Sequence, residues 1–207
     1  LMGRELEELR IVTCHLGAGA SLCAVCHGVS IDTTMGFTPL EGLVMATRSG
    51  SVDPGLVLWL IRQAGLEPAA VEDALGHRSG LLGLCGTSDM REVCDGVAHG
   101  EAASQLALAV YAHRLRAAIA AMTASLGGLD ALVFTGGVGE HAPVVRRAAT
   151  ETLGYLGIEL DDAQNAVAAG DPDGDISSAA ATVSILVVRA REDIEIARQA
   201  RALAAAG

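Results

Sequence analysis

Apolar and polar positions along this chain fall into short apolar runs separated by longer segments with helical spacing. Three of the runs have the length and aliphatic composition of buried strands: residues 11–16, 131–135 and 182–188. Residues 21–33 predict a hairpin that turns at His27 and Gly28. Strands and helices that alternate in this way predict an α/β fold.

Helix signals fill most of the remaining chain. Asp53 followed by Pro54 is typical of an N-cap and a first helical residue, and this helix is predicted to end at Gly65. The longest predicted helix covers residues 101–126; it is polar on only part of its circumference, so we expect it to be largely covered. Further helices are predicted at residues 68–75, 143–153 and 192–205, with a short helix capped by Ser88.

Glycine-rich and polar segments separate these elements and predict loops. Residues 34–50 show little periodicity, and residues 76–88 contain four glycines. The Asp- and Gly-rich run at residues 170–178 lacks the twelve-residue spacing and terminal glutamate of a calcium-binding loop, so we expect a solvated turn there.

Two of the predicted strands run directly into glycine clusters, at residues 17–19 and 136–139. Glycine lets a backbone approach a phosphate closely because it has no Cβ. Turned N–H groups in such segments form a concavity that binds anions. One cluster alone is weak evidence, because glycine turns end many strands for steric reasons. Two clusters about 120 residues apart predict one nucleotide held from two sides.

The composition of the chain limits the classes of partner that this protein can bind. The chain has 207 residues, of which 51% are apolar and only 2% aromatic, so its core must be aliphatic. The net charge is −11 and there is no lysine, which argues against nucleic acid and anionic membrane surfaces as partners. No apolar run approaches the roughly 20 residues of a membrane span. To bind an anionic ligand, this acidic chain would therefore need arginines and helix N-termini clustered at the binding site.

The five cysteines are odd in number and predict free thiols in a reducing cytoplasm, not a disulfide scaffold. Cys23 and Cys26 have the C-x-x-C spacing of some metal sites. Strand residues three apart point to opposite faces, and no second pair follows, so we expect no metal clamp there.

Six motifs, taken in order, resemble those of the acetate kinase family. They are HLGAGAS at 15–21, MGFTPLEGL at 35–43, TRSGSVDP at 47–54, DMR at 89–91, FTGGVGE at 134–140 and REDIEIA at 191–197. The block at 35–43 joined to Thr47 and Arg48 is the most specific, because neither generic α/β packing nor a general nucleotide loop demands it. The resemblance covers nearly the whole chain.

The resemblance implies a ribonuclease H-like domain of the actin-like ATPase and sugar-kinase superfamily, with a mixed sheet flanked by helices. It implies that residues 1–10 connect to an N-terminal domain that this chain lacks, and that residues 11–207 form the C-terminal nucleotide-binding domain. The missing domain would supply further catalytic residues. The resemblance also implies a homodimer.

The reaction implied by this family is reversible, ATP-dependent phosphorylation of a small, short-chain carboxylate to an acyl phosphate, with acetate as the first candidate and ADP as the other product. The attacking carboxylate is already ionised at neutral pH, so transfer depends on alignment and charge neutralisation. The resemblance adds Mg²⁺ as a cofactor. Two alternatives stay open: a propionate or butyrate kinase, and a non-catalytic nucleotide-binding or dimerisation fragment.

By resemblance, Arg48 stabilises the transition state and His15 contacts a phosphate; these are the expected catalytic residues. A planar guanidinium stays charged and holds two phosphate oxygens at once. Glu192 is the expected Mg²⁺ ligand, with Asp193 as its neighbouring competitor. The expected nucleotide contacts are His15, Leu16, Gly17, Ala18, Gly19, Asp89, Met90, Arg91, Gly136, Gly137, Val138, Gly139, Glu140 and His141.

Three positions depart from the pattern of the family. Ala18 and His141 stand where asparagine is usual, and Ala46 stands where glycine is usual. We expect these changes together to weaken nucleotide affinity or to alter substrate choice. None of them removes a charge that the chemistry needs, so we still expect an active enzyme when the upstream domain is present.

Overall fold

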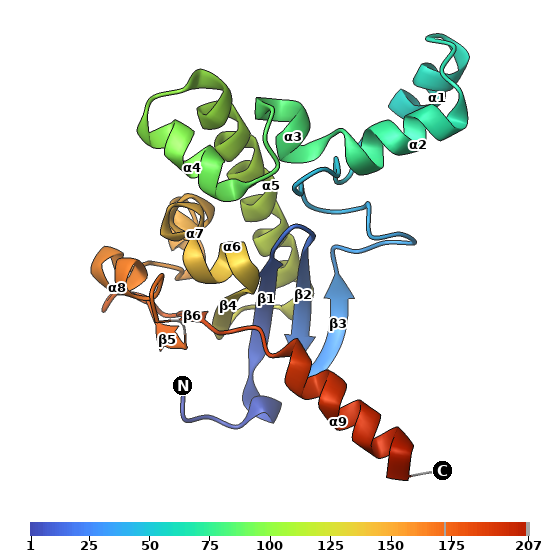
Figure 1. Ribbon diagram of the computed structural model, residues 1–207. Coiled ribbons are helices and arrows are strands. Elements are labelled where there is room, and N and C mark those ends of the chain that lie inside the picture. The colour runs from blue at the N-terminus through green and yellow to red at the C-terminus, as the bar shows by residue number, and fades with distance from the viewer. Residues whose placement is uncertain (172, 206–207) are drawn as a thin grey trace.

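The computed structural model describes residues 1–171 and 173–205 and is built around one mixed sheet (Figure 1). Its strands are β1 (Arg10–Leu16), β2 (Ala20–Cys26), β3 (Val29–Thr33), β4 (Ala131–Thr135), β5 (Gly174–Asp175) and β6 (Ser184–Val187). They lie in the order β3-β2-β1-β4-β6-β5. The pairs β1–β4 and β4–β6 are parallel, and the remaining neighbours are antiparallel. The mixed sheet that we expected is confirmed.

The three predicted buried strands are the parallel centre of this sheet, as β1, β4 and β6. The hairpin is confirmed as well: β2 and β3 pair across a turn at His27 and Gly28. Both turn residues have positive φ, 52° and 78°. A two-residue turn with left-handed backbone at both positions matches the twist of the strands that it joins.

Helices of very different lengths surround the sheet. They are α1 (Pro54–Arg62), α2 (Pro68–His77), α3 (Gly80–Cys85), α4 (Met90–Ala98), α5 (Ala102–Leu126), α6 (Gly136–His141), α7 (Pro143–Thr150), α8 (Asp162–Val167) and α9 (Glu192–Ala205). Two short 3₁₀ turns cover Leu6–Glu8 and Gly154–Leu156. The predicted start of α1 is confirmed, because the Asp53 carboxylate accepts from the N–H of Gly55.

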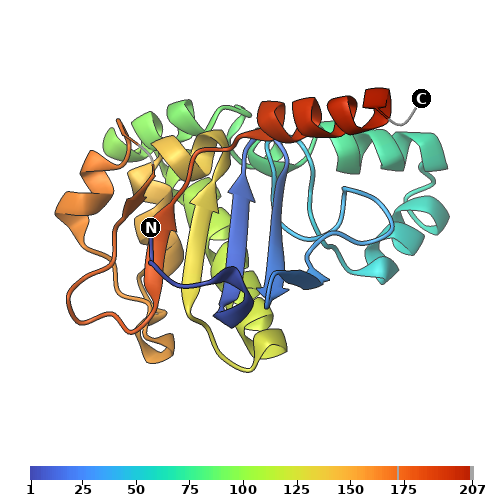
Figure 2. The same ribbon diagram turned by 90° about the horizontal axis from the view of Figure 1, so that it is seen from below.

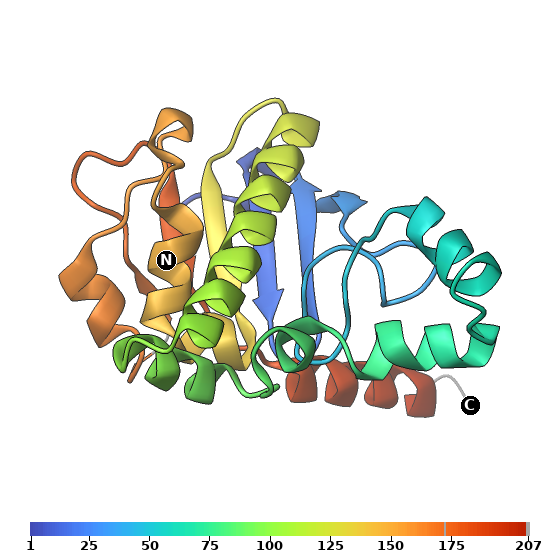
Figure 3. The same ribbon diagram turned by 90° about the horizontal axis from the view of Figure 1, so that it is seen from above.

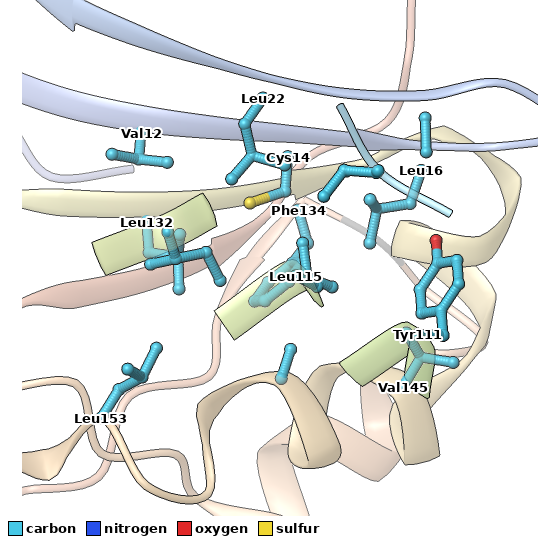
Figure 4. Packing of buried hydrophobic residues seen from close by; sticks show 14 of the residues in the cluster. Val12, Cys14, Leu16, Leu22, Tyr111, Leu115, Leu132, Phe134, Val145 and Leu153 are labelled. Atoms are coloured by element: carbon cyan, nitrogen blue, oxygen red, sulfur yellow. The ribbon is translucent and has the colours of Figure 1, made fainter. Parts of the chain in front are cut away.

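The core lies between the sheet and α5. This helix packs on β1, β2 and β3, and α7 packs beside it on the same side (Figure 3). In Figure 2 the other face of the sheet is in view, with no helix across its strands in the described part of the chain. Side chains from both layers meet in the core, among them Cys14, Leu115 and Phe134 (Figure 4). Such burial of apolar surface is the main source of stability.

The expectation that the long helix is largely covered is wrong. Helix α5 buries one face, which includes Leu108, Tyr111 and Leu115, while Leu106 on the outer side is exposed. Alanines occur on both the buried and the exposed side of α5, so the hydrophobicity of the sequence alone does not separate the two faces.

Four further local features differ from the predictions. The 76–88 loop contains α3, the second glycine cluster is the start of α6, and α8 was not expected. Helix α4 is capped by Asp89, whose carboxylate accepts from the N–H of Arg91, and not by Ser88. Short helices of this kind depend on tertiary contacts more than on intrinsic propensity.

The predicted 170–178 turn includes residue 172, and the predicted domain extends to residues 206–207; these three residues lie outside the described part. Among the described residues, no helix is both long and apolar enough to cross a membrane. All five cysteines are free, as expected.

Candidate functional site

The two glycine clusters meet at one edge of the sheet. Strands β1 and β4 are parallel neighbours, with His15 paired to Thr135. The segments that follow the two strands therefore leave the sheet at the same end. Gly136 has φ 78°, and a Cβ built on it would lie 2.8 Å from the carbonyl oxygen of Leu16. Only glycine allows these two backbones to lie so close. Ligands of open α/β sheets bind outside this end of the strands.

Arg48 lies beside the first glycine cluster. A Cβ built on Gly19 would be 3.5 Å from the Arg48 Nη1 atom. The same loop is joined to the cluster by a hydrogen bond from the N–H of Ala46 to the carbonyl of Ala18, 3.2 Å long. The guanidinium donates to the carbonyl of Pro39 at 3.3 Å. Among the described residues it pairs with no carboxylate, so its charge is available to an anion.

Helix α3 fixes the loop at residues 45–48, which carries Arg48 and is called the Arg48 loop below. The N–H groups of Ser79, Leu81 and Leu82 donate to the carbonyls of residues 47, 45 and 46. Gly80 has φ 61°, and a Cβ there would lie 2.2 Å from the carbonyl oxygen of Met45. The loop that carries Arg48 therefore has a defined conformation set by a neighbouring helix.

His15 and Glu192 face each other across the same edge. His15 ends β1, and Glu192 is the first residue of α9. The His15 Nε2 atom is 3.7 Å from Glu192 Oε1, and both side chains are well exposed, at 41% and 74%. The structure thus brings together the residues predicted to contact a phosphate and a metal ion.

A pocket of about 690 Å³ opens between α4, α6 and the first glycine cluster. This volume lies within the usual range for small-molecule sites. Its walls include eight of the predicted residues: Gly17, Ala18, Asp89, Met90, Arg91, Gly137, Val138 and His141. Most of its surface is apolar, which suits a flat ring system better than a phosphate chain.

Asp89 and Arg91 form one wall and are linked to each other. The Arg91 Nη2 atom lies 2.5 Å from Asp89 Oδ2. Hydrogen bonds from Arg91 lower the pKa of the Asp89 carboxyl to about 2. Asp89 is therefore ionised throughout the physiological range, and it also caps α4.

Sequence reasoning missed part of the pocket wall: Leu81, Cys94, Asp95, Tyr111, Ala142, Pro143 and Val144. A local signal existed for Cys94 and Asp95, which follow Met90 and Arg91 by one helical turn and so share their face. Tyr111 gave no such signal, because its place depends on how α5 packs against the sheet.

Leu16, Gly139 and Glu140 are among the predicted contact residues that do not line the pocket. Leu16 is fully buried, and a Cβ on Gly139 would lie 3.4 Å from the backbone of Phe134. Glu140 is only 7% exposed, and its carboxylate accepts from the N–H groups of Gly136 and Ala190, each at 2.9 Å. The structure gives these residues packing or anchoring roles, and their contact with a ligand stays a prediction.

The three positions that depart from the family pattern all lie on the pocket wall: Ala18, Ala46 and His141. His141 is held by a 3.0 Å hydrogen bond between Nδ1 and the carbonyl of Ala169, and its Nε2 is 4.0 Å from Glu140 Oε2. An imidazole fixed in this way presents a different hydrogen-bond pattern from an asparagine.

The donor chemistry around Glu192 fits a magnesium ion that arrives with a nucleotide. Within residues 1–171 and 173–205, no group of three or more His, Cys, Asp or Glu side chains could hold a metal alone. Mg²⁺ is commonly bound by one or two carboxylates, waters and substrate phosphates. The exposed carboxylate of Glu192 matches that mode, and the neighbouring Asp193 is exposed as well.

Comparison with known proteins matches residues 1–198 to the Acetokinase family. The acetate kinase of Gloeobacter violaceus is 53% identical over 201 residues, which cover 96% of this chain and 49% of that protein. The chain thus spans about half the length of the curated relatives it matches.

Solved structures agree with this match. Porphyromonas gingivalis acetate kinase superposes with a TM-score of 0.89 at 38% identity, over 93% of this chain and 48% of that one. A propionate kinase from Francisella tularensis gives a TM-score of 0.85 at 38% identity, over 91% of this chain and 48% of that one. These likenesses support the predicted actin-like ATPase fold class.

Proposed function

The chain belongs to the acetokinase family, and from this premise we propose that it forms the nucleotide-binding half of an ATP-dependent carboxylate kinase. The observation that carries the proposal is the position of Arg48, whose guanidinium pairs with no carboxylate of the described residues and lies beside the glycine cluster at residues 17–19, next to the 690 Å³ pocket. Residues 11–207 are proposed as this C-terminal domain, and residues 1–10 as its connection to an N-terminal domain.

The adenosine of ATP or ADP is proposed to enter the pocket between α4 and α6. Its apolar lining suits the base, and Asp89, Met90 and Arg91 form the wall opposite Gly137, Val138 and His141. The phosphates would then extend toward the edge of the sheet where β1 and β4 end. There the N–H groups of Ala18 and Gly19 would be the backbone donors, because the N–H of Gly17 donates to the carbonyl of Gly19.

The proposed transfer joins a carboxylate oxygen to the γ-phosphorus while the bond to the ADP oxygen breaks, giving an acyl phosphate. No proton has to be removed, because the carboxylate is already ionised. Arg48 stabilises the charge on the moving phosphoryl group, and His15 binds and orients a phosphate from the end of β1. Mg²⁺ carried by the phosphates would neutralise further charge, and Glu192 would help to hold it.

Acetate is the first substrate that we propose, and propionate is the second. The relative from Gloeobacter violaceus is an acetate kinase at 53% identity, whereas one of the similar solved structures is a propionate kinase at 38%. The second half of the active site and part of the acyl pocket would come from the N-terminal domain.

We also propose a homodimer in the cytoplasm. Helix α1 buries none of its residues within the chain, and Leu56, Leu58 and Trp59 expose large apolar surfaces on it. Patches of this kind commonly mark interaction sites. Five free cysteines fit a reducing compartment. Light scattering tests the proposed homodimer, and a strictly monomeric protein would contradict it.

A second candidate function is nucleotide binding without catalysis by this chain alone. It is favoured by the pocket, whose walls come from this chain and do not include Arg48, His15 or Glu192. Calorimetry with ADP on the chain separates the two candidates: binding without transfer fits a binding module.

The test of the kinase is a hydroxylamine trap for acyl phosphate on the complete protein. We expect hydroxamate to form only with ATP and a short-chain carboxylate, and acetate to be the preferred one. A folded protein inactive with acetate, propionate and butyrate would contradict the proposal.

A further inference from the structure

Glu140 is a buried carboxylate that the proposed transfer does not use. It lies at the end of α6 and is 7% exposed. Burial of a charge is costly unless hydrogen bonds compensate for it. Here one oxygen, Oε1, accepts from the N–H of Gly136 and from the N–H of Ala190, each at 2.9 Å.

The two N–H groups belong to segments far apart in the chain. Gly136 begins α6 and the second glycine cluster, where its positive φ lets the chain lie against Leu16. Ala190 lies between β6 and α9, two residues before Glu192. One carboxylate oxygen thus joins the glycine cluster to the segment that carries the proposed metal ligand.

Other contacts hold both segments around this junction. Arg146 is fully buried, and its guanidinium donates to the carbonyls of Gly139 and Glu140 at 2.8 and 2.7 Å. These hydrogen bonds fix the C-terminal end of α6. Asp173 accepts from the N–H of Arg189 at 2.8 Å and pairs with the Arg191 side chain at 2.6 Å. Asp173 therefore anchors only one of the two segments, residues 189–191, whereas Glu140 anchors both.

We propose that Glu140 is a positioning residue that couples nucleotide binding at the glycine cluster to metal binding at Glu192. This inference rests on the proposed function for the identity of the two ligands. Charge-assisted hydrogen bonds to backbone N–H groups are about twice as strong as neutral ones, so a carboxylate suits the junction. Loss of the carboxylate would remove one anchor from each of the two segments at the same time.

The first experiment measures the junction without any ligand. Hydrogen exchange of the complete protein is followed in peptides that cover residues 131–142 and 184–192. Glu140→Ala is expected to speed exchange at both by about tenfold or more, because the buried N–H of Gly136 and the partly buried N–H of Ala190 lose their acceptor. Glu140→Gln keeps an acceptor oxygen and should stay within about threefold of the parent. Asp173→Ala, the control, should speed exchange only in the second peptide.

The second experiment measures ADP affinity by calorimetry with and without Mg²⁺. Glu140→Ala is expected to weaken ADP binding by about tenfold without Mg²⁺ and by more with it. Asp173→Ala should reduce only the extra affinity that Mg²⁺ brings, and Glu140→Gln should recover most of both losses. If Glu140→Ala does not fold, Glu140→Asp replaces it, because its shorter side chain reaches the two N–H groups less well.

The coupling role is overturned if only one of the two peptides responds, or if ADP affinity stays within twofold of the parent in both conditions. A parent protein that binds no ADP contradicts the proposed function instead. In that case the exchange measurement still decides whether Glu140 joins the two segments.

Discussion

At the scale of single residues, Arg48 has the property that phosphoryl transfer requires most. Its charge lies beside a glycine cluster and pairs with no carboxylate in the part of the chain that is described. Several other arginines are ion-paired; for example, Arg78 pairs with Asp73 at 2.7 Å. A guanidinium that pairs with no carboxylate is poised to bind an anion.

Arg48→Ala is predicted to leave the fold intact and to lower the turnover of the complete protein by roughly 10³-fold or more, as loss of comparable arginines does. Arg78→Ala is the matched control, since it removes an equal charge from an exposed pair, and it should change turnover by less than twofold. Hydroxamate formation and circular dichroism measure both variants. A loss below tenfold for Arg48→Ala would reject the role proposed for it.

Asp130 offers a second test at the residue scale. It follows α5, and it accepts hydrogen bonds from the backbone and side chain of Arg10, the first residue of β1. These hydrogen bonds lower the pKa of Asp130 to about 2. A carboxyl whose folded pKa is depressed adds stability above its unfolded pKa of about 3.9 and loses it as pH falls toward the folded value.

Asp130→Asn is therefore predicted to reduce the free energy of unfolding by about 1 kcal/mol at pH 7, after allowance for solvent screening. The difference from the parent should shrink between about pH 4 and pH 2. Urea titrations at several pH values measure it. A difference that stays constant down to pH 2 would mean that the ionised form is not what stabilises the fold.

At the scale of elements, α3 shows how a short helix sets the shape of a functional loop. Its first N–H groups donate to the carbonyls of residues 45–47, directly before Arg48. The close approach depends on Gly80, where a side chain would meet the Met45 carbonyl. The glycine-rich composition that predicted a loop is therefore what lets the helix pack there.

Gly80→Ala is predicted to lower stability by about 1–3 kcal/mol and to weaken ADP binding, because the added Cβ demands a backbone shift at the Arg48 loop. Gly76→Ala is the control: it lies in α2, and a Cβ built on it would meet no atom within 4 Å. That substitution should be neutral or stabilise by up to about 1 kcal/mol. Thermal unfolding compares them, and equal effects would contradict the packing argument.

At the scale of the whole molecule, one sheet edge gathers residues from distant parts of the chain. His15, Arg48, the 136–139 cluster and Glu192 all lie near the ends of β1 and β4. A ligand that touches several of these segments would stabilise the folded state as a unit, because it binds the folded chain and not the unfolded one.

ADP at about 100 times its Kd is predicted to raise the free energy of unfolding by about 2.7 kcal/mol. For a chain of this size that corresponds to a rise in Tm of roughly 5–10 °C. Differential scanning fluorimetry measures it, with the Arg91→Ala variant at the pocket wall as a weaker binder for comparison. No shift at saturating ADP would contradict nucleotide binding by this chain.

Local signals were enough for much of the fold and for the outline of the site. The hairpin at His27 and Gly28 and the cap at Asp53 follow from the backbone preferences of a few adjacent residues. The central strands follow from their apolar runs. Two glycine clusters after two such strands predicted a shared site, and β1 and β4 are indeed neighbours.

Only the tertiary structure decided the features that depend on partners distant in sequence. Helix α3 forms against carbonyls more than 30 residues before it, and Glu140 turns inward because Ala190 supplies an N–H 50 residues later. The exposed side of α5 likewise depends on which layers pack against it. The reason is physical: local preferences are set by adjacent residues, whereas the energy of a buried hydrogen bond exists only once both partners have been brought together.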